Sequence, residues 1–454
     1  MTKQEKIKKY GFVYDVCSGF QFDLNTVLKP VANEFCEGDY CDHNCTYDCG
    51  NYDCPAAFTH NKNIDLKSVM SLANVTEALK RAKAGLTEMN RVFLTKYFDN
   101  YAVQYNIDSE TASDVKKTLE MAKLEVNLFG GNPELHPNFL DIIPMAKKMG
   151  WKTTTTTTGK KFLYDDEFLE RFSASPPDLI ACSADDFGGI EELKKILDMP
   201  LADIKMFWQK ANPLYGQRKK AYESVYLAKL TQNQKFCPMM FNVVVHPGNL
   251  QVIKDILDLL RLHFTNAKIN PYPAQASFGY SIVDWEESDL PTVEEFIDYM
   301  INNQIAGVEN YVSRLPYWLA LKSVFLTVEN KQEIISLISG NNIWQCFRNS
   351  GAGRYLQAGK RENMDSKKFI PGGHPGCFWN NKTVTDSRQI WNLNAEEIAD
   401  YLLTKKPIMG QKASYPCHGC IMPRLMFDGI SIELGLNPKL LPKYLNLRKK
   451  YFGF

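Results

Sequence analysis

The chain has 454 residues, of which 44% are hydrophobic, and its 53 basic side chains balance 52 acidic ones. This length and apolar content suffice for one large domain or for two to three ordinary ones. The balanced charge excludes a global attraction to nucleic acid or to an anionic membrane surface, so a small or locally recognised substrate fits better. Residues 1–10 are lysine-rich but precede no apolar run, and no run approaches the ~18 apolar residues of a membrane span. A cytoplasmic protein is therefore expected.

The first predicted element is a strand within residues 22–33, which carry Val and Leu at strand spacing. It runs into a segment that holds five of the twelve cysteines, Cys36, Cys41, Cys45, Cys49 and Cys54. Turn-forming residues separate them, so an irregular backbone is expected to present the sulfurs. Because cytosolic thiols are kept reduced, these cysteines are expected to ligate metal rather than to form disulfides.

A helical insert is predicted next, over residues 55–123. Its predicted apolar face consists of Leu72, Val75, Leu79, Ala82 and Leu86, with further apolar positions at Val92, Phe93, Tyr97, Tyr101 and Val103. Five more strands follow, at residues 124–129, 152–158, 178–183, 239–245 and 267–272. Helical patterns are found at residues 138–149, 165–172, 190–197, 219–230, 249–262 and 292–338. This alternation predicts an α/β fold with a mostly parallel sheet that closes toward a partial (β/α)6 TIM-like barrel.

The composition divides the chain into four regions. After about residue 340 it becomes rich in Gly and Asn and only weakly periodic. We expect an N-terminal segment at 1–21, a partial barrel at 22–280, a helical connector at 281–340 and a cysteine-containing extension at 341–454.

The loops that follow parallel strands are expected to line one mouth, where such sheets bind ligands. Three side chains on these loops are candidates for contact with a substrate or for catalysis, Asp186, His246 and Gln275. A lone histidine is more often structural than catalytic, so His246 is a candidate only because of its place after a strand.

Cys41, Cys45 and Cys49 are separated by three residues in each gap. Three such thiolates can hold three irons of a [4Fe-4S] cluster and leave the fourth iron open to a small molecule. Cys36 or Cys54 could replace one of them. The alternative is a structural zinc or iron site that uses four of the five sulfurs.

The order of strand, three-cysteine loop, Gly-Gly-x-Pro segment and strand-ending Thr-Gly resembles the radical S-adenosylmethionine enzymes, whose usual loop is CxxxCxxC. Lys29-Pro30 before the loop is similar to the sulfatase-maturase or SPASM branch of that family. The spacing departs from the family, because three residues lie between Cys45 and Cys49 where the family has two. The resemblance implies reductive cleavage of S-adenosylmethionine to a 5′-deoxyadenosyl radical that abstracts hydrogen from substrate. It implies a flavodoxin or ferredoxin as reductant and a peptide or protein side chain as substrate, with a small metabolite as the alternative.

The same resemblance implies a set of cofactor-binding residues. Gly130-Gly131-Asn132-Pro133 resembles the GGEP segment, which hydrogen-bonds the amino group of the cofactor. Here Asn132 stands at the Glu position, and Glu134 is the nearby carboxylate. Thr158 and Ser183 resemble the residues at the ends of the third and fourth strands, and the serine commonly contacts the sugar or carboxylate of the cofactor.

Four late cysteines, Cys346, Cys377, Cys417 and Cys420, include one CxxC pair. They resemble the twitch and SPASM extensions, which implies one auxiliary iron-sulfur cluster. Zinc is the alternative ligand. From another functional class, a non-catalytic electron-transfer or zinc-structural protein stays open, and it predicts fully ligated sites that bind no S-adenosylmethionine.

Overall fold

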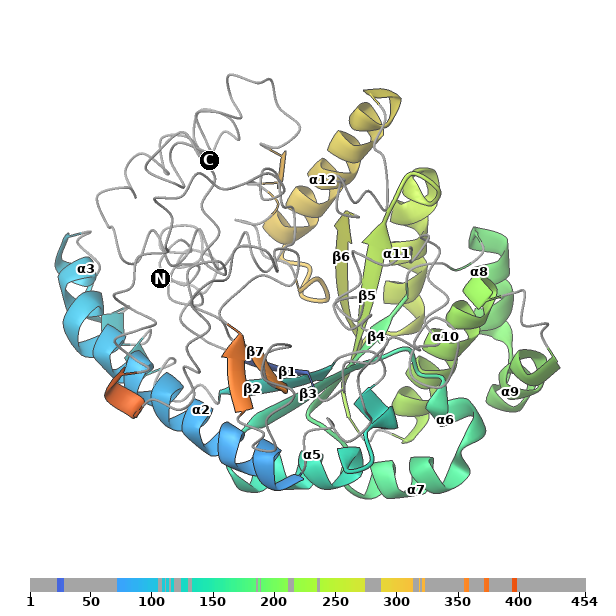
Figure 1. The fold of residues 1–454 in the computed structure, drawn as a ribbon. Helices are drawn as coiled ribbons and strands as arrows, with labels where there is room; N and C mark the ends of the chain where they lie inside the picture. The colour runs from blue at the N-terminus through green and yellow to red at the C-terminus, as the bar shows by residue number, and fades with distance from the viewer. Residues whose placement is uncertain are drawn as a thin grey trace.

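The computed structural model describes residues 23–27, 72–104, 108–110, 112–113, 116–117, 124–129, 133–184, 187, 189–210, 216–234, 237–273, 287–312, 318, 321–322, 355–358, 371–374 and 394–397. Within these residues, strands lie at the centre and helices surround them on one side (Figure 1).

Six parallel strands form the centre of the fold, and they neighbour one another in chain order. Their bounds are β1 Asp23–Val27, β2 Glu125–Phe129, β3 Lys152–Thr157, β4 Leu179–Ser183, β5 Met239–Val245 and β6 Lys268–Pro273. Because parallel crossovers are right-handed, this order places every connecting helix on the same face of the sheet. The predicted α/β fold with a parallel sheet is confirmed, and the strand order is consistent with a partial TIM-like barrel.

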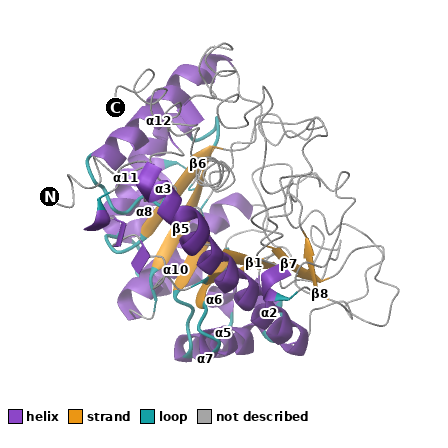
Figure 2. Ribbon diagram, turned by 90° about the vertical axis from the view of Figure 1, so that its left-hand side faces the viewer, coloured by secondary structure: helices purple, strands orange, loops and turns teal. Residues whose placement is uncertain are grey.

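The helices pack outside the strands, along the lower and right-hand side of Figure 1, and the turned view of Figure 2 shows them again as an outer layer. They are α5 Phe139–Lys148, α6 Lys161–Tyr164, α7 Asp166–Ala174, α8 Ile190–Asp198, α9 Leu201–Lys210, α10 Gly216–Gln234, α11 Ile253–His263 and α12 Leu290–Ile305, with 3₁₀ turns at Pro133–Leu135, Leu250–Val252 and Glu287–Asp289. In the described part of the chain, no helix is both long and apolar enough to cross a membrane.

The sequence missed two helices, the short α6 and α9. In α9, Ile204 and Trp208 are the buried hydrophobic residues, and the apolar pattern is correspondingly weak. The largely helical stretch expected over residues 292–338 begins with α12, which ends at Ile305. Tyr311 then forms a parallel bridge with Ile269 of β6, and residues 318 and 321–322 are helical again. The chain leaves α12 at Gly307, whose φ of 77° favours glycine.

The helical insert is confirmed from α2, Leu72–Val92, through a π-helix at Phe93–Phe98 to α3, Asp99–Gln104. Val75, Leu79 and Ala82 are buried as predicted. Val103 is 79% exposed, so its assignment as an apolar packing position was wrong. Ala102 is the buried neighbour, and consecutive residues on a helix point about 100° apart.

Two strands from the late part of the chain extend the sheet at its β1 edge. β7, Tyr355–Ala358, pairs parallel with β1, and β8, Pro371–His374, pairs antiparallel with β7. Their local sequences did not predict this pairing, because strand partners so distant in sequence leave no local periodic signal.

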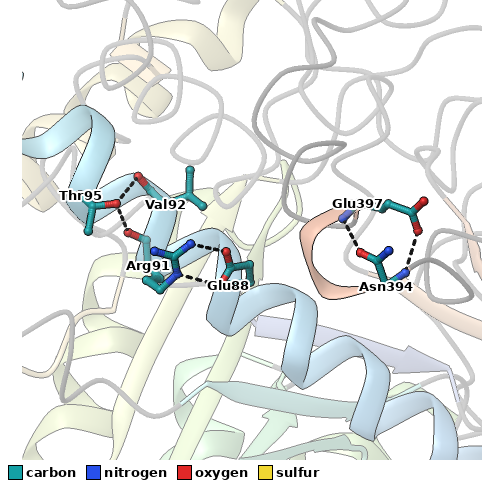
Figure 3. A network of polar contacts seen from close by, with 6 residues as sticks. All are labelled: Glu88, Arg91, Val92, Thr95, Asn394 and Glu397. Atoms are coloured by element: carbon teal, nitrogen blue, oxygen red, sulfur yellow. Dashed lines mark hydrogen bonds and ion pairs between the residues drawn. The ribbon is translucent and has the colours of Figure 1, made fainter.

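Residues 394–397 begin with a reciprocal helix cap. The Glu397 N–H donates to Asn394 Oδ1, and the Asn394 N–H donates to Glu397 Oε2, both at 2.9 Å (Figure 3). This is the capping-box arrangement, with Asn as the cap. On α2, hydrogen bonding and charge attraction from Glu88 raise the pKa of Arg91, and Glu396 adds a smaller attraction.

Alternate strand residues pack against the helices and form the core, among them Val126, Leu128, Ile180, Phe241, Val243 and Ile269. Below β3 the core holds four phenylalanines from α5, α6 and α7. The Phe172 ring lies 4.8 Å from that of Phe162, 5.7 Å from that of Phe168 and 6.4 Å from that of Phe139, measured between ring centroids.

Five of the six consecutive threonines, Thr153 to Thr157, lie in β3 as predicted, and Thr158 follows the strand. Buried hydroxyl groups cost free energy unless they are hydrogen-bonded. On the helix-facing side, Thr155 donates to the Leu128 carbonyl (3.2 Å) and Thr153 to Asp178 (3.0 Å). On the other side, Thr154 donates to Glu125 (2.7 Å). A strand of threonines is therefore stable here because groups on neighbouring strands and loops accept hydrogen bonds from its hydroxyls.

Candidate functional site

The carboxyl ends of β1 to β6 lie at the same end of the sheet, because all six strands are parallel. We call this end of the sheet the mouth. The described residues that follow the strands there include Pro133 and Glu134 after β2, Thr158 after β3, and His246 after β5. Ser183 is the last residue of β4.

Many predicted site residues lie outside the described part of the chain. These are Cys36, Cys41, Cys45, Cys49, Cys54, Gly130, Gly131, Asn132, Asp186, Gln275, Cys346, Cys377, Cys417 and Cys420. Among the described residues, no three His, Cys, Asp or Glu side chains come together as a metal site. The nine cysteines predicted as ligands lie outside these residues, so the metal sites stay predictions.

Glu134 is nearly buried, with 3% of its surface exposed. The Thr157 hydroxyl donates to its Oε1 at 2.6 Å, a short bond typical of a charged acceptor. The same hydroxyl accepts the N–H of Gly159 at 2.9 Å. Lys161 Nζ donates to the backbone carbonyl of Glu134 at 3.1 Å. The segments that follow β2 and β3 are therefore tied together through one carboxylate.

Gly159 makes the turn at the end of β3 possible. Its φ of 87° lies in the left-handed region, and a Cβ there would lie 3.0 Å from the backbone oxygen of Glu223 on α10. Both the conformation and the close approach of α10 therefore require glycine.

We expect Gly159→Ala to destabilise the protein by about 1–3 kcal/mol through backbone strain, and by about 1–3 kcal/mol more through overpacking against Glu223. Gly189→Ala is the matched control, because Gly189 has a φ of 96° but nothing within 4 Å of an added Cβ. Chemical denaturation of the two variants measures the difference. Equal shifts in their midpoints would show that the contact with α10 contributes nothing.

The face of the sheet that points away from the helices carries amide and hydroxyl groups, and we call it the inner face. Ser183, Asn242 and Asn270 occupy one register row across β4, β5 and β6, and each is partly exposed. Asn270 Nδ2 donates to Asn242 Oδ1 at 3.0 Å. That bond occupies Asn242 Oδ1 and directs the two N–H donors of Asn242 elsewhere.

A second hydrogen bond joins the inner-face side chains of β2 and β3, from the Thr156 hydroxyl to Asn127 Oδ1 at 3.2 Å. Local sequence patterns did not identify Asn127, Asn242 or Asn270 as site residues. A signal was present, because asparagine is depleted from strands and each of these residues lies within a largely apolar run.

His246 is held in a turn at the end of β5. Its N–H donates to Asn249 Oδ1 (2.9 Å), and its ring Nδ1 accepts the N–H of Gly248 (3.2 Å). An accepting Nδ1 means that a neutral imidazole carries its proton on Nε2. Nε2 is therefore the donor atom of the neutral ring, and it is buried.

The two described cysteines are not suited to metal binding. Cys182 is fully buried on the helix side of β4, and its thiol donates to the Thr158 carbonyl at 3.4 Å. Burial raises the pKa of Cys237 to about 12, which disfavours the thiolate that a metal requires.

No protein-family model and no curated protein matches the chain. Among solved structures, it is similar to Streptococcus suis SuiB bound to S-adenosylmethionine, at 12% identity and a TM-score of 0.43 over 90% of this chain and 73% of that one. SuiB bound to its precursor peptide SuiA matches at 13% identity and a TM-score of 0.42, over 94% and 76% of the two chains. AdoMet-bound anSMEcpe matches at 12% identity and a TM-score of 0.41, over 93% and 100%. At this level, similarity does not establish a shared activity.

The side chains on the inner face indicate whether the described residues suit S-adenosylmethionine as a ligand. A barrel that packs only against itself fills its interior with bulky branched side chains. Here Asn127, Thr156, Ser183, Asn242 and Asn270 are partly exposed on that face. Amide and hydroxyl groups suit a ligand with sugar hydroxyls, an amino group and a carboxylate, so the cofactor fits these residues.

Proposed function

We propose that this chain is a radical S-adenosylmethionine enzyme that acts on a peptide or protein side chain. The strand order carries the proposal. The cysteine loop, Gly130–Pro133, Thr158 and Ser183 follow or end strands whose carboxyl ends share the mouth. Because parallel strands in this order end at one mouth, the segments that follow them in sequence are proposed to meet there, as the resemblance to the family requires.

Cys41, Cys45 and Cys49 are the proposed ligands of the [4Fe-4S] cluster. Gly130, Gly131 and Asn132 are the proposed contacts of the cofactor amino group. The cluster and cofactor together would supply one-electron cleavage of a carbon-sulfur bond and hydrogen abstraction from substrate.

The other side chains at the mouth bind and orient. The Thr158 and Ser183 hydroxyls are proposed to hydrogen-bond the sugar or carboxylate of the cofactor. His246, Asp186 and Gln275 are proposed candidates for contact with adenine or with substrate. Asn242 offers two N–H donors toward the inner face, which suit the carbonyl groups of a peptide.

We further propose that Cys346, Cys377, Cys417 and Cys420 hold one auxiliary cluster. The pairing of β7 with β8 supports this, because Tyr355 lies opposite His374. Cys346 precedes β7 by nine residues and Cys377 follows β8 by three, so both extend from the same end of the hairpin. The proposal includes the region boundaries given above, a cytoplasmic location and a flavodoxin or ferredoxin as reductant.

The test is anaerobic reconstitution with iron and sulfide, followed by dithionite, S-adenosylmethionine and chromatography of the products. We expect 5′-deoxyadenosine and methionine in equal amounts. Protein that loads iron but forms no 5′-deoxyadenosine with any reductant would support the non-catalytic alternative. Zinc retained in place of iron would support a structural site.

A further inference from the structure

We infer that Glu134 and Thr157 position the Gly130–Asn132 loop, and that Glu134 is not itself a cofactor ligand. The inference rests on the proposed function for the identity of the ligand, S-adenosylmethionine. It concerns the carboxylate closest in sequence to the position where Asn132 replaces the family glutamate.

The first support is the side of the sheet on which the carboxylate is held. Thr157 is buried and alternates with Thr156, which is partly exposed on the inner face. Thr157 pairs in register with Cys182, whose side chain is fully buried in the core. A carboxylate that accepts the Thr157 hydroxyl therefore lies on the helix-facing side, away from the polar inner face.

The second support is that Glu134 is anchored through both its side chain and its backbone. Oε1 accepts from Thr157, and the carbonyl accepts from Lys161 Nζ. Lys161 is itself held, since its Nζ lies 4.6 Å from the centroid of the Phe168 ring. Glu134 thus connects the 3₁₀ turn after β2 with the end of β3 and the start of α6.

Four residues, 130–133, connect Phe129 to Glu134. Phe129 is the last residue of β2 and pairs with Val27 of β1, and Glu134 is tied to Thr157. The Gly130–Asn132 loop and Pro133 therefore span two fixed points. Fixing both ends lowers the ordering cost of a loop that must offer its backbone to a ligand. Glycines in such a loop need this support most, because they have the most conformational freedom to lose.

Thr157→Val tests the link, because it removes the hydroxyl and keeps the shape. Thr155→Val is the matched control on the same strand and the same side, since Thr155 is equally buried but donates to Leu128. In the protein as purified, we expect the amides of residues 130–135 to exchange hydrogen faster in Thr157→Val and at the wild-type rate in Thr155→Val.

After reconstitution, equilibrium dialysis with S-adenosylmethionine should show a Kd raised on the order of tenfold in Thr157→Val and Glu134→Ala, the usual cost of losing a residue that orients a ligand group. Thr157→Ser and Glu134→Gln keep a donor and an acceptor, so both should restore exchange rates and Kd. The Thr155→Val control should bind as the wild type does.

Three results separate the possibilities. Equal exchange and equal Kd in Thr157→Val and Thr155→Val would overturn the positioning role. A Kd that rises in Glu134→Gln but not in Thr157→Val would overturn it in favour of direct ligation by the carboxylate. A wild-type protein that binds no S-adenosylmethionine would refute the proposed function, while the exchange comparison would still decide whether Glu134 and Thr157 order the loop.

Discussion

Replacing Cys41, Cys45 or Cys49 by alanine is expected to abolish formation of 5′-deoxyadenosine and to lower the iron bound after reconstitution. Each replacement removes one of the three thiolates that hold an open-iron cluster, and no side chain other than cysteine supplies the same charge and softness. Cys36→Ala and Cys54→Ala should retain product formation. The measurement is product per chain together with iron and sulfide content for each of the five variants.

Cys237→Ala provides the control for the loss of a thiol as such. The raised pKa of Cys237 makes it a poor ligand, so this variant should load iron and form product as the wild type does. Loss of product in Cys36→Ala with retention in Cys49→Ala would refute the proposed ligand set. The additional residue between Cys45 and Cys49 is the reason to test for that outcome, because it changes the spacing of the proposed ligands.

Phe172→Ala should have the largest effect on stability, about 3–5 kcal/mol, because it deletes a ring from the centre of the packed core. Phe172 is fully buried and contacts the rings of Phe139, Phe162 and Phe168. Those residues belong to α5, α6 and α7, so the cavity would loosen the layer that supports β3 and the turn at Gly159. The midpoint of chemical denaturation, followed by circular dichroism, measures the loss.

Phe207→Ala is the matched control, since the same ring is 43% exposed on α9. An exposed substitution of this kind is expected to change stability by no more than roughly 0.5 kcal/mol. If both phenylalanine variants shift the midpoint equally, the aromatic cluster does not contribute as its burial implies.

The sequence determined the strands and most of the helices, because the burial of one side of each element produces a local period of apolar residues. β-branched and apolar runs predicted β2 to β6 closely, and the threonine run was correctly interpreted as a strand. Local signals were weak where a helix buries few side chains, as in α9, and misleading at Val103, which lies one position away from the buried face of α3.

The sequence also determined which motifs follow which strands, and this order supports the family resemblance. It could not determine which side of the sheet a loop carboxylate occupies. The pairing of β3 with β4 places Thr157, which donates a hydrogen bond to Glu134, on the helix-facing side. Likewise, the strand register alone brought Ser183, Asn242 and Asn270 into one row. Periodicity reports that a side chain is buried, whereas only the tertiary pairing decides what it contacts.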